Sequence, residues 1–299
     1  MGAKTPTVQK EIVQIKVRSK NEKVFLVSAG DFHIGATSFN EAAFFKFIEH
    51  LWALTQIGQV YLLLMGDIFD SINVNDKRFN LAEHDKSMDD SQVFMAKAMA
   101  RLHGNPNFHV VGSLTGNHEL KYCRGDSDPI FRLYQATGIK PLGMKCYIYF
   151  DFILKGKKTA TLRTVAFHGC SNSRLPQGRT RIVREFLKEN QLTEDEFIRL
   201  NQIAFYGHTH DCKVEEVKSY VPNVRAGTTA EYTQYACLTG SFYDIANFNT
   251  SSYAAEHGYT PSPVGYVCVT ATLDTDLRVE TVTNHGLNPN VEHRSWGKF

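Results

Sequence analysis

The first part of the chain alternates between short runs of apolar residues and segments in which apolar residues recur at helical spacing. The short runs predict buried strands, and the helical spacing predicts helices that bury one face. Asn40 is a suitable N-cap for the first helix. The resulting β-α-β-α-β order predicts an α/β sheet with helices packed on it. The predicted strands are Glu11–Val17 (a half-buried edge strand), Val24–Ala29, Val60–Met65 and Phe108–Leu114, and the predicted helices are Phe39–Leu54 and Gln92–Leu102.

The pattern changes after about Lys140, where strands and turns become frequent. We expect a single domain over residues 1–299, because the chain shows no internal repeat and no convincing linker. In this domain the strand-rich segment 211–299 is expected to complete a second, more antiparallel sheet. The elements predicted here are a hairpin of Cys146–Leu154 with Thr161–Phe167, helices Arg179–Glu189 and Glu194–Leu200, strand Ile203–Tyr206, and a hairpin of Gly265–Leu273 with Leu277–Thr283.

Composition narrows the class of protein without naming a function. The 299 residues include 33 Lys+Arg and 31 Asp+Glu, so the formal net charge is only +2, and hydrophobic residues make up 42%. These values exclude a disordered chain, a collagen-like repeat and a supercharged nucleic-acid tail. The near-neutral charge predicts no broad polyanion-binding surface. The count of 12 histidines is the one unusual value, and their placement carries the rest of the interpretation.

Targeting and redox signals are weak. Six cysteines are scattered without a paired spacing such as C-x-x-C, which favours free thiols over disulfides. The N-terminal segment is polar and lacks the apolar core of a signal peptide. The longest apolar run, Val60–Met65, is too short to span a bilayer. We therefore expect a cytoplasmic protein that does not insert into a membrane.

Five short polar segments stand at the ends of predicted strands. Such ends are where ligand-binding loops gather in α/β proteins, because the sheet fixes their positions. Five of the 12 histidines fall in these segments, together with three aspartates and one asparagine. The segments are Asp31-Phe32-His33, Gly66-Asp67-Ile68-Phe69-Asp70, Gly116-Asn117-His118-Glu119, His168-Gly169 and Gly207-His208-Thr209-His210.

These residue types suit a metal site. Imidazole, carboxylate and amide ligands without thiolate favour Mn, Fe, Zn or Mg over a structural zinc site. In D-x-H and H-x-H the two polar side chains share one side of an extended segment, so each pair can point at one centre. The candidates number about seven, too many for one tetrahedral ion but suited to two ions that share a carboxylate. Two such ions can clamp a phosphoryl group and generate a hydroxide nucleophile at neutral pH.

The five segments, in this order, resemble the calcineurin-like metallophosphoesterase superfamily. Its pattern is D-x-H, G-D-x-x-D, G-N-H-[DE], H and G-H-x-H, which this chain matches between Asp31 and His210. The resemblance implies an α/β fold in the form of a four-layer α-β-β-α sandwich, with a dinuclear metal site at the strand ends. It also implies that a metal-bridging hydroxide attacks phosphorus.

The resemblance assigns roles residue by residue. It implies that one metal is held by Asp31, His33, Asp67 and His210, and the second by Asp67, Asn117, His168 and His208, with Asp67 bridging. His118 would then be a general acid or transition-state stabiliser at the leaving-group oxygen, and Asp70 would orient it.

The sequence indicates the type of phosphoester substrate less clearly than it indicates the metal ligands. Protein phosphatases of this superfamily usually place Arg-Gly after G-D-x-x-D and Arg before G-N-H-E, where this chain has Ser71-Ile72 and Thr115. Glu119, in contrast, is the form of the third motif that those enzymes use. The residues of the first two motifs most closely resemble those of the Mre11/SbcD-like nuclease branch. This favours a diester substrate over a phosphoprotein.

Further candidates for substrate contact lie near the motifs. Four arginines could grip a phosphate, because a guanidinium matches phosphate oxygens, although a solvated loop and helix face explains them equally well. These are Arg124, Arg174, Arg179 and Arg181. An aromatic-rich segment after the last motif could stack a base or fill a core: Tyr232, Tyr235, Phe242, Tyr243, Phe248, Tyr253 and Tyr259. The other histidines, His84 among them, lack ligand-like spacing and are predicted to be surface or structural.

Together these features predict a metal-dependent phosphodiesterase that hydrolyses DNA, RNA or a nucleotide diester, with two divalent ions as cofactors. Mn²⁺ is the preferred ion, with Fe, Zn and Mg as alternatives. The competing hypotheses are a phosphomonoesterase for a small molecule, nucleotide or phosphoprotein, and a non-catalytic scaffold. The scaffold hypothesis predicts missing ligands, and every expected position is filled here.

Overall fold

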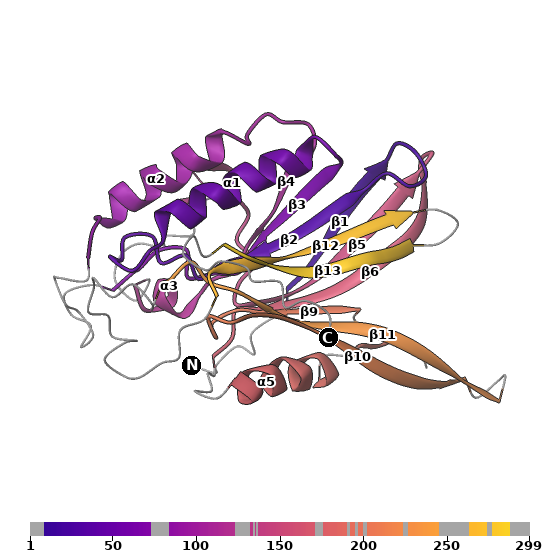
Figure 1. The fold of residues 1–299 in the computed structure, drawn as a ribbon. Helices are drawn as coiled ribbons and strands as arrows, with labels where there is room; N and C mark the ends of the chain where they lie inside the picture. The colour runs from indigo at the N-terminus through magenta and orange to yellow at the C-terminus, as the bar shows by residue number, and fades with distance from the viewer. Residues whose placement is uncertain are drawn as a thin grey trace, which may run out of the picture.

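The fold is mixed α/β and contains two principal sheets and a few helices (Figure 1). The computed structural model describes residues 9–72, 84–122, 132–133, 135, 137–170, 176–189, 192–194, 197–199, 202–223, 227–244, 263–273 and 277–287. Within these residues no helix has both the length and the apolar character needed to cross a membrane.

One sheet has five strands in the order β13-β12-β2-β3-β4. Three of them, β2 (Val24–Ala29), β3 (Gln59–Leu64) and β4 (Phe108–Ser113), run parallel, as the predicted β-α-β-α-β order requires. β12 (Gly265–Leu273) pairs antiparallel with β2 and with β13 (Leu277–Gly286). β2 and β3 are buried along their whole length, which explains their continuous apolar runs.

The second sheet has six strands in the order β1-β5-β6-β9-β11-β10. β1 lies at its edge, as the half-buried pattern predicts, and β6 and β9 run parallel to each other. A separate two-stranded sheet holds β7 (Leu192–Glu194) and β8 (Phe197–Arg199). The remaining bounds are β1 Gln9–Val17, β5 Lys145–Leu154, β6 Lys157–Phe167, β9 Ile203–Tyr206, β10 Cys212–Asn223 and β11 Thr228–Thr239.

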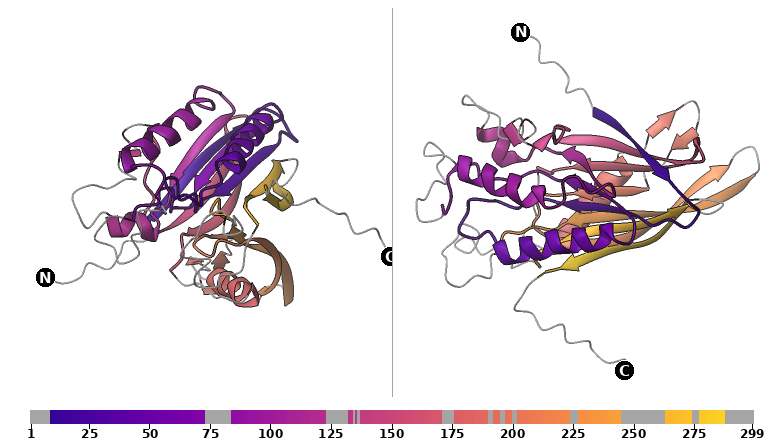
Figure 2. Two further views of the ribbon diagram at one scale, coloured as in Figure 1. Left: turned by 60° about the vertical axis from the view of Figure 1, so that its left-hand side comes forward. Right: turned by 90° about the horizontal axis from the view of Figure 1, so that it is seen from above.

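Figures 1 and 2 show the helices and the two sheets arranged in layers. Three hydrophobic cores fill the space between these layers. The first joins α1 (Glu41–Thr55) and α2 (Met88–Ala100) to one face of the five-stranded sheet. The second contains residues of both sheets, such as Leu26 of β2 and Phe205 of β9, so the two sheets face each other. The third joins α5 (Pro176–Glu189) to the outer face of the six-stranded sheet.

Local sequence explains how α1 starts and which face it buries. The Asn40 side chain accepts a hydrogen bond from the backbone N–H of Ala43 at 2.9 Å, which caps the helix as predicted. Phe44, Phe47 and Leu51 are buried against the sheet. Burying each such side chain stabilises the fold by about 1.5–3 kcal/mol. This packing holds α1 against the sheet that carries the first two motifs.

Three parts of the fold differ from the sequence prediction. The helix predicted over 194–200 is wrong, because Glu194 ends β7 and Phe197–Arg199 forms β8; the β-branched Thr193 and Ile198 favour extended backbone. A short helix, α3 (Asn117–Tyr122), begins inside the G-N-H-E motif and was not predicted. Among the described strands of segment 211–299, β10 and β11 join the second sheet, whereas β12 and β13 extend the first.

Candidate metal centre

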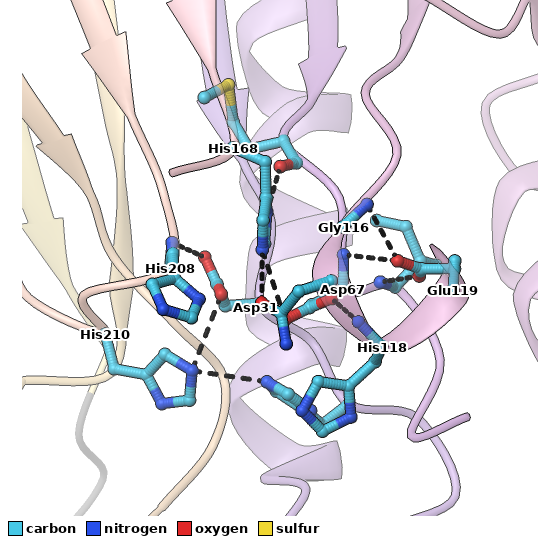
Figure 3. Close-up of polar contacts among 12 residues, drawn as sticks. Asp31, Asp67, Gly116, His118, Glu119, His168, His208 and His210 are labelled. Atoms are coloured by element: carbon cyan, nitrogen blue, oxygen red, sulfur yellow. Dashed lines mark hydrogen bonds and ion pairs between the residues drawn. The ribbon is translucent and has the colours of Figure 1, made fainter. Parts of the chain in front are cut away.

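The five predicted motifs converge at the carboxyl ends of β2, β3, β4, β6 and β9 (Figure 3). Potential ligand atoms come within 4.8 Å of one another in three groups, two of which each contain three of the four residues of a predicted ligand set. Of these two, one holds Asp31, His33 and His210, and the other holds Asp67, His168 and His208. The sheet ends therefore bring together residues that are up to 179 positions apart in the chain.

The first group is arranged as ligands of one centre would be. Nε2 of His33 lies 3.2 Å from Nε2 of His210, and the latter lies 3.4 Å from Oδ1 of Asp31. Ligand atoms about 2.1 Å from a shared metal lie about 3.0–3.4 Å apart. Oδ1 of Asp31 is buried and accepts no hydrogen bond from any residue that the structure describes. A buried carboxylate oxygen of this kind is costly unless a cation or donor meets it, so the group fits a divalent metal.

The second group contains the predicted asparagine. Nε2 of His168 lies 3.2 Å from Oδ2 of Asp67 and 3.0 Å from Oδ1 of Asn117. The other ring nitrogen of His168, Nδ1, lies 2.8 Å from the carbonyl oxygen of Met65. Because a carbonyl only accepts, Nδ1 carries the proton, and Nε2 is left to face the two oxygens. Fixing the tautomer in this way is typical of histidines that bind metals.

The backbone at the site adopts a conformation that side chains rarely favour. Seven residues other than glycine have positive φ in the described part of the chain, and five of them are predicted ligands. These five are Asp31 (φ 48°), His33 (52°), Asp67 (47°), His208 (63°) and His210 (53°). Such left-handed residues persist where the surroundings fix them, and they cluster at functional sites.

Glu119 is the group that fixes two of the motif loops. Its Oε2 accepts hydrogen bonds from the backbone N–H of Asp67 (3.0 Å) and of Gly116 (2.9 Å). Its Oε1 accepts from the N–H of Ile68 (2.6 Å) and of Phe69 (3.3 Å). Burial and the negative charge of Asp67 raise the pKa of Glu119 to about 7. This fully buried carboxylate ties the G-D-x-x-D loop to the G-N-H-E loop.

Asp31 is held by two other segments. Its Oδ2 accepts a hydrogen bond from the backbone N–H of His208 at 3.0 Å. Its carbonyl oxygen accepts from the Ser241 hydroxyl (2.9 Å) and from the Phe242 N–H (3.0 Å), just past the end of β11. The D-x-H loop is thus fixed both by the last motif and by a segment outside the motifs.

Asp70 and His118, which the resemblance implies are an acid and its orienting partner, lie side by side. Nδ1 of His118 lies 3.3 Å from Oδ1 of Asp70, and Nδ1 of His33 lies 3.7 Å from the same oxygen. Burial alone would raise the pKa of Asp70, but the facing His118 and His33 outweigh it and hold that pKa well below its usual range. A ring nitrogen of His118 also lies within 4.8 Å of ligand atoms of His33 and Asp67. The pair therefore borders the candidate metal centre.

Burial and nearby charges also shift the pKa values of Asp31, His33 and His208. Burial alone would raise the pKa of Asp31, but the facing His210 lowers it below its usual value. Burial lowers the pKa of His33, and lowers that of His208 to about 4 with help from the nearby His168. The carboxylate is ionised and these two imidazoles are neutral near pH 7, which are the forms that ligate metals.

In Asp67 and His168, the charge of the partner opposes the effect of burial on the pKa. Burial alone would lower the pKa of His168, but the negative charge of Asp67 raises it to about 10. Burial alone would raise the pKa of Asp67, but His168 brings it well below its usual value. The negative charge of Asp67 and the imidazole of His168 thus favour each other's charged forms. A metal bound between them would displace the extra proton of the charged imidazole.

Comparisons with known proteins leave the family open. No family model matches the chain. None of the curated proteins matches it either. Among solved structures 27 chains match, including "GAP50 the anchor in the inner membrane complex of Plasmodium", with 11% identity and a TM-score of 0.30 over 88% of this chain and 89% of that one. At this identity and TM-score the match assigns no function.

Two of the four predicted substrate arginines, Arg179 and Arg181, lie in the described part of the chain. Arg124 and Arg174 lie outside the described residues. On α5, Arg179 is buried and Arg181 is exposed. Of the aromatic segment, Phe242 packs in the first core against Phe32 of the D-x-H motif.

Tyr243 is the aromatic residue that reaches the candidate ligands. Its ring centroid lies 5.2 Å from that of His33 and 5.6 Å from that of His210. Tyr232 is 48% exposed on β11, and Phe248, Tyr253 and Tyr259 lie outside the described residues. The described residues of the segment therefore divide among the core, the site and the surface.

Sequence reasoning missed three contributors to the site. It gave no structural role to Glu119, although a carboxylate three residues after Gly116 at a helix start is a signal for capping backbone N–H groups. It passed over Ser241, whose position after a strand was the available signal. It also assigned His84 no role, yet Nδ1 of His84 lies 3.5 Å from Oδ2 of Asp70.

Proposed function

We propose that the chain is a dinuclear metal-dependent phosphodiesterase of the calcineurin-like metallophosphoesterase type, with the α-β-β-α sandwich of that superfamily. Its substrate is a nucleic-acid or nucleotide diester. The observation that carries the proposal is the convergence of Asp31, His33 and His210 with Asp67, His168 and His208 at one set of strand ends. Free thiols at the five described cysteines support a reducing, cytoplasmic location.

The donor set defines the ions that would fit. One ion would be held by Asp31, His33, Asp67 and His210, and the second by Asp67, Asn117, His168 and His208. Mn²⁺ is our first choice, because the donors are imidazole, carboxylate and amide without thiolate. When bound, two such ions would neutralise charge on the phosphoryl oxygens and acidify a water molecule.

His118 supplies the proton in this proposal. Its Nδ1 faces Oδ1 of Asp70 at 3.3 Å, so Nε2 is the nitrogen left to meet the leaving-group oxygen. Asp70 is 6% exposed at its side chain and keeps the ring in the tautomer and orientation that proton donation requires. The Asp67 Oδ1 atom accepts a hydrogen bond from the backbone N–H of His118 at 2.9 Å, which places the acid directly beside the shared carboxylate.

A diester is favoured over a monoester by the residues around the motifs. Phosphoprotein phosphatases of the proposed family grip the extra negative charge of a monoester with arginines, and Ser71 and Thr115 stand at those positions here. Ser71 is 4% exposed and donates a hydrogen bond to the Phe69 carbonyl at 3.4 Å, so its side chain is engaged within its own loop. A singly charged diester needs fewer cationic partners than a monoester dianion.

A substrate panel tests the proposal. The protein, stripped of metal and then loaded with Mn²⁺, is assayed with bis-p-nitrophenyl phosphate, p-nitrophenyl phosphate, single-stranded DNA and cyclic nucleotides. We expect hydrolysis of the diesters that is lost on chelation and in Asp67→Asn. Preference for the monoester would replace the diesterase with a phosphomonoesterase. Absence of hydrolysis with Mn²⁺, Fe²⁺, Zn²⁺ and Mg²⁺ would leave the non-catalytic scaffold instead.

A further inference from the structure

Asp70 faces a third imidazole that belongs to none of the motifs. Its Oδ1 faces His118 and His33, and its Oδ2 faces Nδ1 of His84 at 3.5 Å. The side chains of Asp70 and His84 are only 6% and 15% exposed. The carboxylate behind the predicted acid is thus enclosed by imidazoles on both of its oxygens.

The backbone of His84 is fixed to the D-x-H loop. His84 forms an isolated antiparallel bridge with Ala36. The next residue, Asp85, donates its backbone N–H to the carbonyl oxygen of Gly35 at 2.7 Å. Gly35 and Ala36 follow directly after the candidate ligand His33 and its neighbour Ile34. His84 therefore keeps its position relative to the metal centre through main-chain contacts, which is a requirement for aligning another side chain.

We propose that His84 is a positioning residue, which holds Oδ2 of Asp70 so that Oδ1 stays on His118. A carboxylate bound through one oxygen can still rotate about its Cβ–Cγ bond, and such rotation would move Oδ1 away from the His118 ring. A donor on Oδ2 restricts that rotation. Outer partners of this type orient the groups that do chemistry, and losing one typically costs about 10–100-fold in activity. The inference rests on the proposed function, because it assigns His84 to the acid of that reaction.

A cavity beside His84 makes the idea testable by chemical rescue. The cavity has a volume of about 370 Å³, and its wall includes Asp70, His84, Ser71 and Lys86. Truncating His84 to alanine would enlarge this space next to Oδ2. Free imidazole can then enter and face the carboxylate in place of the lost ring.

Kinetics with bis-p-nitrophenyl phosphate and Mn²⁺ form the first test. His84→Ala is expected to lower kcat about 10–100-fold, with KM and metal content unchanged, and added imidazole is expected to restore part of it. His84→Asn should retain more activity than His84→Ala, because the Asn amide nitrogen takes the place of Nδ1. The matched control is His103→Ala, at an exposed histidine after α2, which should leave kcat unchanged. An undiminished kcat in His84→Ala would overturn the proposal.

A double-mutant cycle asks whether His84 acts through Asp70. If it does, Asp70→Asn combined with His84→Ala should be no slower than Asp70→Asn alone. Losses that multiply would refute the proposed route.

A measurement without turnover separates this inference from the proposed function. In protein labelled with ¹⁵N-histidine, His84→Ala should shift the ring nitrogen signals of His118, whereas His103→Ala should not. Unchanged His118 signals would refute the positioning role even if the protein hydrolyses diesters. Shifted signals in a chain that hydrolyses no phosphoester would uphold the contact and overturn the reaction.

Discussion

Replacing Gly116 by alanine is the most direct test of how the site is built. A Cβ atom at this position would lie 2.0 Å from Oδ1 of Asp67 and 2.3 Å from its backbone nitrogen. It would also lie 2.6 Å from Oε2 of Glu119. Contact between such atoms is ordinarily about 3.5 Å, so Asp67 must move by about 1 Å or more. The obstacle includes backbone, which cannot rotate away as a long side chain does.

The displacement of Asp67 allows the loss of stability and the loss of turnover to be estimated. Overpacking of this kind costs about 1–3 kcal/mol, and the contact with backbone places Gly116→Ala near 3 kcal/mol. At about 2 °C per kcal/mol for a chain of this size, the Tm should fall by about 6 °C. A shift of about 1 Å in the shared carboxylate should lower turnover about 100-fold.

Calorimetry and diester hydrolysis measure the two effects on one preparation. Gly286→Ala is the matched control, because a Cβ there meets nothing within 4 Å and both values should stay at the wild-type level. A Gly116→Ala protein with wild-type Tm and turnover would refute the packing argument for the G-N-H-E motif.

Three further predictions address the acid, the metal and pH. His118→Ala should reduce turnover about 100-fold or more with metal content intact, as measured by kcat and elemental analysis; unchanged turnover would remove His118 from the reaction. Mn²⁺ at about 100 times its Kd should stabilise the wild type by about 2.7 kcal/mol in calorimetry, and Asp67→Asn should lose most of that gain; equal stabilisation of both would contradict a shared Asp67 ligand. Burial lowers the pKa of His50 and of His285 below the ordinary value of 6.5. A lowered pKa in the folded state contributes stability above pH 6.5 that is lost as pH falls, so Tm should drop less between pH 7.5 and 5.5 in a His50→Gln, His285→Gln double variant; an unchanged slope would argue against this linkage.

The strands of the fold could be predicted from the sequence, because strands that are buried in a sheet consist of consecutive apolar residues. β2 and β3 are buried at every position, and their apolar runs delimit them within one or two residues. The candidate ligands could also be predicted, since each follows such a run and its residue type restricts its chemistry. Asp31 and Asp67, for example, stand directly after β2 and β3.

The remainder depends on contacts between distant segments, which no local pattern records. β12 pairs with β2 across more than two hundred residues, so nothing in its own sequence tells which sheet it joins. The contact of His84 with Asp70 depends on a bridge to Ala36 and has no spacing signature. The segment that forms β7 and β8 carried an ambiguous apolar spacing, and its two short strands pair with each other where a helix was predicted.

Five candidate ligands have a left-handed backbone conformation, which lowers the stability of the chain at the positions that its proposed function needs. Each such residue costs about 1–2 kcal/mol relative to an ordinary conformation, and glycine alone adopts it without that cost. Replacement of His208 or His210 by glycine would therefore relieve the backbone while it removed a candidate ligand. A design procedure that optimised this protein for thermal stability alone would favour glycine at such positions, and the candidate metal centre would lose ligands.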